Sequence, residues 1–175
     1  MAWEIDPFHT LVEFSVRHLT IMTVKGRFPD VHGTIHLDPQ YPEHCRVKAQ
    51  IETASIHTGS SQRDAHLRSA DFFEVAKYPT ITFESTLIKP MGQNRSILNG
   101  DLSLHGVTKP VSMSVMYTGH TRDPFTNAWR VGLCGATMID RREFCMKYNE
   151  RNGVGALIVG YEVRIDINIE AVQME

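Results

Sequence analysis

Nine histidines in a chain of 175 residues raise the question of a metal site. His32 and His36 are four residues apart, a spacing that would bring two ligands together on a helix. On a strand, however, four residues span about 13 Å, whereas zinc binds each imidazole nitrogen at about 2 Å. One ion cannot reach both side chains, and no histidine pair is spaced i, i+2. The pattern therefore predicts no metal site.

The cysteines and serines offer no clear nucleophile. Cys45, Cys134 and Cys145 are odd in number and widely spaced, which argues against a disulfide framework and favours a reducing compartment. Cys134 follows a strand-like alternation and is interpreted as a packing residue, while Cys145 would react only beside a cation that stabilises its thiolate. The chain has no Gly-x-Ser-x-Gly motif and no glycine loop for phosphate. We predict no catalytic residue.

Four polar residues are candidates to hold the polar head of a ligand. His18 ends an apolar strand face, where it could donate to a head-group oxygen or bond to neighbouring backbone as a structural histidine. Arg63 and His66 lie three apart on one face of a predicted helix, where they could contact a head group or fix the helix to the rest of the fold. Arg141 could reach inward from a strand end, although we expect a solvated guanidinium on a buried stem.

The elements that must position these residues are mostly strands. Between Tyr161 and Glu170 apolar and polar side chains alternate at every step, as on a strand with one wet face. The same alternation recurs in 12–18, 47–52, 81–85 and 111–118, and turn signals separate the runs. We predict about eight long antiparallel strands, with one helix at Ser61–Ser69 capped by Ser60 or Ser61, and a shorter turn at 70–75.

Eight antiparallel strands need closure or two packed sheets, because open edges invite aggregation. Alternation alone is compatible with a barrel or a sandwich; strand length and the single helical insertion favour an all-β barrel. Small residues at Ala49, Ser85 and Gly135 are expected to leave room inside it. The apolar side chains predicted to face that interior, and to bind a ligand there, are Phe14, Val16, Phe28, Ile51, Phe73, Phe83, Leu102, Leu104, Met113, Val115 and Met138.

Composition excludes several classes of protein. A hydrophobic fraction of 42% and a charged fraction of 22% are typical of one globular domain, here residues 1–175. The net charge of -2 gives no footprint for nucleic acid. No apolar run is long enough for a membrane span, so we expect no stable membrane insertion. The first residues lack the features of a signal peptide, which predicts a cytoplasmic location.

Motifs along the whole chain resemble those of the YceI-like family, the lipocalin-like polyisoprenoid-binding proteins. The most specific is Gly100–Val111, with the sequence GDLSLHGVTKPV. The other matching segments are Trp3–Pro7 with His9, Val12–His18, Val24–Phe28, Ser55–Thr58, Arg63–Leu67, Ala70–Phe73 and Tyr78–Phe83. The segment Arg141–Cys145 departs from the family pattern, which has Gly after Phe144. Many family members carry an export signal, whereas the first residues of this sequence do not predict one.

The resemblance implies an extended eight-stranded antiparallel lipocalin-like barrel whose cavity takes a long-chain lipid, such as a polyisoprenoid, an isoprenoid quinone or a fatty amide. It implies sequestration or transport without catalysis, a homodimer, and no cofactor apart from a bound isoprenoid or fatty-chain lipid. Two alternatives stay open: an enzyme that acts on a lipid head group through His18, Arg63 or His66, and an interaction module with an incidental cavity.

Overall fold

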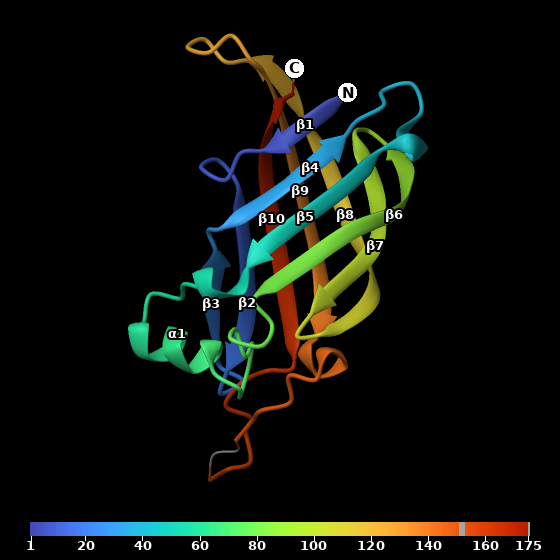
Figure 1. Ribbon diagram of the computed structural model, residues 1–175. Helices are drawn as coiled ribbons and strands as arrows, with labels where there is room; N and C mark the ends of the chain where they lie inside the picture. The colour runs from blue at the N-terminus through green and yellow to red at the C-terminus, as the bar shows by residue number, and fades with distance from the viewer. Residues whose placement is uncertain (151–152, 175) are drawn as a thin grey trace.

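The computed structural model describes residues 1–150 and 153–174, and these form a barrel with one short α-helix (Figure 1). The strands are β1 (Ala2–Ile5), β2 (Leu11–His18), β3 (Met22–Phe28), β4 (Val31–His36), β5 (Arg46–Glu52), β6 (Thr80–Gly92), β7 (Arg95–Leu104), β8 (Val107–Arg122), β9 (Trp129–Asp140) and β10 (Glu162–Gln173). The helices are α1 (Ser61–Arg68) and three 3-10 turns, η1 (Pro42–His44), η2 (Thr53–Ser55) and η3 (Arg141–Phe144).

Eight strands close the ring, in the order β1-β4-β5-β6-β7-β8-β9-β10 and back to β1. All the pairings are antiparallel. β10 pairs with β2 through residues 164–168 and with β1 through residues 171–173, so β1 and β2 follow one another along the same edge. β3 and β4 are likewise separated only by Pro29 and Asp30. The predicted eight-stranded antiparallel barrel is confirmed.

Local sequence explains both interruptions. Between β1 and β2, Asp6 accepts the backbone N–H of Phe8 at 2.9 Å and turns the chain. Between β3 and β4, Pro29 has no N–H to give to a neighbouring strand. Each interruption lets a strand bend while its two halves stay in the wall.

The segment between β5 and β6 covers the free edge of β3 (Figure 1). Arg27 of β3 pairs with His57 of this segment, through two backbone hydrogen bonds of 2.9 Å. Ser60 caps α1 by accepting the N–H of Arg63, as the sequence predicts. The buried carboxylate of Asp64 accepts both the N–H and the hydroxyl of Thr58. Burial would raise the pKa of Asp64, but these hydrogen bonds lower it more.

The barrel is packed at the end where η3 and the β5–β6 segment lie. Phe28, Ile56, Leu104, Phe144 and Met146 form one buried cluster there. Phe144 and Ile56 are 1% and 0% exposed, so this end of the barrel is filled with side chains. We call it the sealed end.

Candidate functional site

A cavity of about 980 Å³ lies within the ring of strands. Its walls are apolar side chains from the inner faces of the strands, among them Val115 of β8, Leu133 of β9, and Ile165 and Ile167 of β10. These side chains point inward yet are only half-buried, because they border open space instead of packing against one another. Its volume is at the upper end of the usual range for small-molecule sites.

The cavity is open at the end of the barrel where both chain termini lie (Figure 1). Gly92, Asn94, Arg95, His120 and Trp129 line it there, and all five are exposed. We call this end, bordered by the 37–45 loop, the β6–β7 turn and the β8–β9 hairpin, the mouth. At the opposite end Phe72, Arg141 and Met146 line the cavity and are buried, so the residues that the structure describes close the tube there.

The mouth carries most of the polar groups that reach the tube. Asn94, Arg95, Ser96 and Gln173 line this part of the cavity. The hydroxyl of Tyr117 hydrogen-bonds Nδ1 of His120. A polar head group at this end could bond to protein and water together, while a tail below would meet apolar walls.

At the sealed end, Arg141 is 3% exposed and also lines the tube. Its guanidinium donates to the carbonyl oxygens of Gly160 (2.9 Å), Met146 (2.7 Å) and Val159 (3.1 Å). It also lies over the ring of Tyr161, 4.9 Å from its centroid. Burial lowers the pKa of Arg141. The interpretation of Arg141 as a solvated arginine is therefore wrong, because its donors join the 141–146 and 159–160 segments under the barrel.

Eleven of the predicted site residues line the cavity together: Phe14, Val16, Phe28, Ile51, Phe73, Phe83, Leu102, Leu104, Met113, Val115 and Arg141. Of the small residues expected inside, Ala49 and Gly135 line it as well. Ser85 is buried in the wall, where its hydroxyl accepts the N–H of Val47 at 2.8 Å. The inward alternation predicted for 81–85 and 111–117 is present, and a register shift follows each run, after Ser85 in β6 and after Tyr117 in β8.

Four predicted site residues do not line the cavity. Met138 is 56% exposed, because its neighbour Ile139 holds the inward position on β9, and the prediction that Met138 faces the interior is wrong. His18 is exposed at the end of β2, beyond Val16. Arg63 donates to the carbonyl and hydroxyl of Thr58, and His66 hydrogen-bonds Asp71 at 2.8 Å. Both contacts lie within the β5–β6 segment, so they stabilise the insertion itself and do not join the helix to the barrel.

The sequence reasoning missed the residues of the mouth and most of the β10 wall. Trp3, Tyr117, His120 and Trp129 line the tube but were not predicted as site residues. The strict alternation of β10 was a usable signal for its wall residues, Val163, Ile165, Ile167 and Ile169, which line the tube. The mouth has no such signal, because its residues come from the ends of several strands that only the closed ring brings together.

Cys145 occupies a left-handed backbone conformation, with φ of 60° and ψ of 16°. It ends η3, and its N–H bonds the carbonyls of Arg141 and Arg142. Glycine adopts this conformation without steric cost, whereas a residue with a Cβ does not. The geometry thus explains why the family pattern has glycine at this position, and it places the departure on the outside of the sealed end, away from the tube wall.

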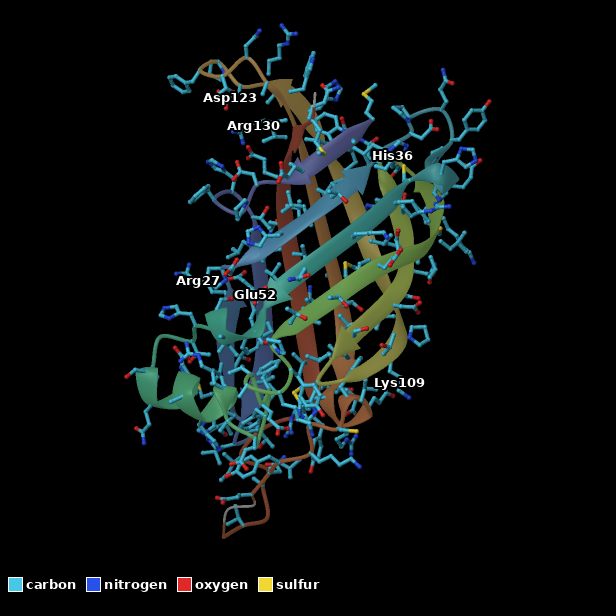
Figure 2. The ribbon with its side chains drawn as sticks, in the orientation of Figure 1. Arg27, His36, Glu52, Lys109, Asp123 and Arg130 are labelled. Carbon is cyan, nitrogen blue, oxygen red and sulfur yellow. The ribbon has the colours of Figure 1, made fainter. Side chains whose placement is uncertain are left out.

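Outside the tube, near the mouth, Arg130 pairs with three carboxylates, and Figure 2 labels it together with one of them, Asp123. It donates to Asp6 at 2.7 Å, to Asp123 at 2.8 Å and to Glu170. Asp6, His9 and Glu170 also have ligand-type atoms within 4.8 Å of one another. The guanidinium already supplies positive charge at that spot. Burial would raise the pKa of Asp6, but hydrogen bonds from Arg130, His9 and the Phe8 N–H lower it to about 2.

No helix in the described ranges has the length and apolar character needed to cross a bilayer.

Comparison with known proteins places the chain in a family. The model of the YceI-like domain matches residues 3–171. A UPF0312 protein of Azotobacter vinelandii is 41% identical over 136 residues, which cover 78% of this chain and 70% of that protein. The chain therefore belongs to the YceI-like family.

Two solved structures share the fold. BcnA of Burkholderia cenocepacia has a TM-score of 0.83 at 22% identity, covering 95% of this chain and 98% of that one. A polyisoprenoid-binding domain from Saccharophagus degradans, implicated in plant cell wall breakdown, has a TM-score of 0.73 at 16% identity, covering 98% of each chain. At these identities the likeness concerns the fold.

Proposed function

We propose that this protein binds a long-chain lipid, such as a polyisoprenoid, an isoprenoid quinone or a fatty amide, and sequesters or carries it in the barrel. The tail lies in the tube and the head group at the mouth. The observation that carries the proposal is the tube itself, which is apolar along its wall, open at the mouth and closed by described residues at the other end. The polyisoprenoid-binding domain with the same fold supports this choice of ligand class.

The energetics favour a ligand with a long tail. Each methylene removed from water contributes about 0.8 kcal/mol, so one isoprene unit contributes several kcal/mol before costs. Ordering a flexible chain offsets part of this gain, which keeps the affinity below the practical limit near 20 kcal/mol. Because a head group at the mouth stays in contact with water, its own contribution should be small.

The orientation of the bound lipid follows from the difference between the two ends of the tube. At the sealed end, Arg141 already donates to three carbonyl oxygens, so it has little left to offer a head group. At the mouth, Asn94 and Arg95 are exposed and border the opening. The head group therefore belongs at the mouth and the tail end near Phe72 and Met146.

Native mass spectrometry of the purified protein, before and after mild organic extraction, tests the proposal. A bound lipid should be released by extraction and taken up again when quinones or fatty amides are added. The variant Val115→Trp should block uptake, because the indole fills the tube, while its neighbour Ser114→Trp on the exposed outer face should not. Equal uptake by both variants, or a protein that never takes up lipid, would contradict the proposal.

The same experiment tests the enzyme alternative. That alternative relied on His18, Arg63 and His66, none of which lines the tube. A carrier returns its ligand unchanged, so recovery of a modified lipid would favour the enzyme. The homodimer and the cytoplasmic location stay predictions, which light scattering and cell fractionation check.

A further inference from the structure

We propose that the mouth of the barrel docks peripherally on an anionic phospholipid surface, so that the lipid passes directly between bilayer and tube. This inference rests on the proposed function and names the partner from which the ligand comes. It is carried by two features of the mouth, its exposed apolar side chains and its basic residues.

Large apolar side chains around the opening are exposed to solvent. Phe125 is 95% exposed at the tip of the β8–β9 hairpin, which projects past the rest of that end (Figure 1). Met91 near the end of β6 and Tyr41 in the 37–45 loop are 66% and 53% exposed. Trp129 lines the opening itself. Aromatic side chains of this kind are typical of the interface between water and lipid.

The hairpin holds Phe125 in a fixed position. Asp123 accepts the backbone N–H groups of Phe125 (2.8 Å) and Thr126 (3.1 Å), and its second oxygen accepts Nε of Arg130. Figure 2 shows Asp123 and Arg130 together at this end of the molecule. Because these hydrogen bonds tie the turn to the barrel, the backbone at Phe125 is held in place and presents the exposed side chain outward.

Basic residues surround these side chains. Lys89, Arg95, Arg46 and Arg122 are all exposed at the mouth. The guanidinium of Arg122 lies over the ring of Trp129, 5.1 Å from its centroid. Of the acidic residues near the mouth, Asp123 is bonded to Arg130 and to the backbone of the hairpin. Asp38 is half-buried and accepts two backbone N–H groups, and Glu43 is exposed. The charge complements an anionic lipid surface.

The nature of the ligand favours a bilayer over a protein as the occupant of this surface. A tail that left the tube through water would expose its whole apolar length. With the mouth on a bilayer, the tail moves from one apolar medium to another. The tube has its opening at the end that carries Phe125, so docking and exchange need no opening of the barrel wall.

Flotation of the full-length protein with vesicles tests this inference. It should float with vesicles of phosphatidylcholine mixed with phosphatidylglycerol, more weakly with phosphatidylcholine alone, and less as salt is raised. Phe125→Ser should lower the affinity about tenfold or more, and the double variant Lys89→Glu, Arg122→Glu about tenfold. Ile21→Ser removes a side chain that is 73% exposed in the β2–β3 turn at the sealed end, and should change nothing.

Quinone uptake followed in solution without vesicles separates this inference from the proposed function. Phe125→Ser should keep it, because Phe125 does not line the tube. A wild-type protein that takes up quinone but never floats would overturn the docking while leaving lipid binding intact. Equal effects of Phe125→Ser and Ile21→Ser, or a change of oligomeric state in place of flotation, would also overturn it. A protein that takes up no lipid under any condition would remove the proposed function and this inference together.

Discussion

The two ends of the barrel use arginine in opposite ways. At the sealed end Arg141 is buried and its guanidinium donates to three carbonyl oxygens of the segments that close the tube. At the mouth Arg95 borders the same tube but is exposed. Arg141 thus helps to close the barrel, whereas Arg95 is free to contact a ligand at the mouth. A lipid should therefore enter the tube in one orientation. Its head group meets an exposed guanidinium at the mouth, whereas the guanidinium at the sealed end already donates to the protein backbone.

Replacing each arginine by methionine gives the largest expected contrast. Arg141→Met should lower the free energy of unfolding by about 3–5 kcal/mol, because it leaves three carbonyl oxygens without donors in a buried place. Arg95→Met should change it by less than about 0.5 kcal/mol, as is usual for an exposed residue. Urea denaturation followed by fluorescence measures both. Similar losses for the two variants would contradict the division between the ends.

Acid should weaken the ion pairs that Arg130 makes with Asp6, Asp123 and Glu170 beside the mouth. The pKa of Asp6 is about 2, against 3.8 for the free side chain, so its contribution is complete above pH 3.8 and is lost as the pH falls toward 2. A difference of this size corresponds to about 2 kcal/mol. Thermal unfolding from pH 6 to pH 2 should show the loss, and Asp6→Asn should flatten that part of the profile. His9, Asp123, Glu170 and Arg130 share the network, so an unchanged profile in Asp6→Asn would assign the effect to them.

The smallest effect is expected on the outside of the sealed end. Cys145→Gly should raise the free energy of unfolding by about 0.5–1 kcal/mol, because glycine accepts the left-handed conformation at that position. Cys145→Ala keeps a Cβ and should bring no gain. Denaturant midpoints of the three proteins decide the point. A gain with alanine as large as with glycine would show that the thiol, and not the backbone, is the source of strain.

Alternation in the sequence predicted the strands, whereas strand length, the single helical insertion and the family resemblance favoured their closure into a barrel. The helix predicted at Ser61–Ser69 is present as α1 (Ser61–Arg68), and eleven of the predicted site residues line the cavity. Alternation tells which face a side chain takes, but not its height along the barrel. His18 shares a face with Val16 yet lies beyond the end of the tube. Met138 was assigned to the inner face without fixing its strand's phase, and one residue of error turns a side chain outward.

Which end opens could not be predicted from local patterns. The mouth is built from three turns that are distant in sequence, and the seal depends on Arg141 meeting carbonyls some twenty residues later. The sequence around Arg141 does not indicate that its side chain will donate to the carbonyls of Val159 and Gly160. The resemblance to a family led us to expect a cavity, but only the closed ring of strands shows which end of it is open.

The most direct test is the affinity of the delipidated protein for a series of quinones that differ only in the number of isoprene units. The account predicts that affinity rises steeply with each added unit until the tube is full and then levels off, while exchange of the head group at fixed tail length changes little. An affinity that ignores tail length, or that follows the head group, would contradict a hollow apolar tube as the site of binding.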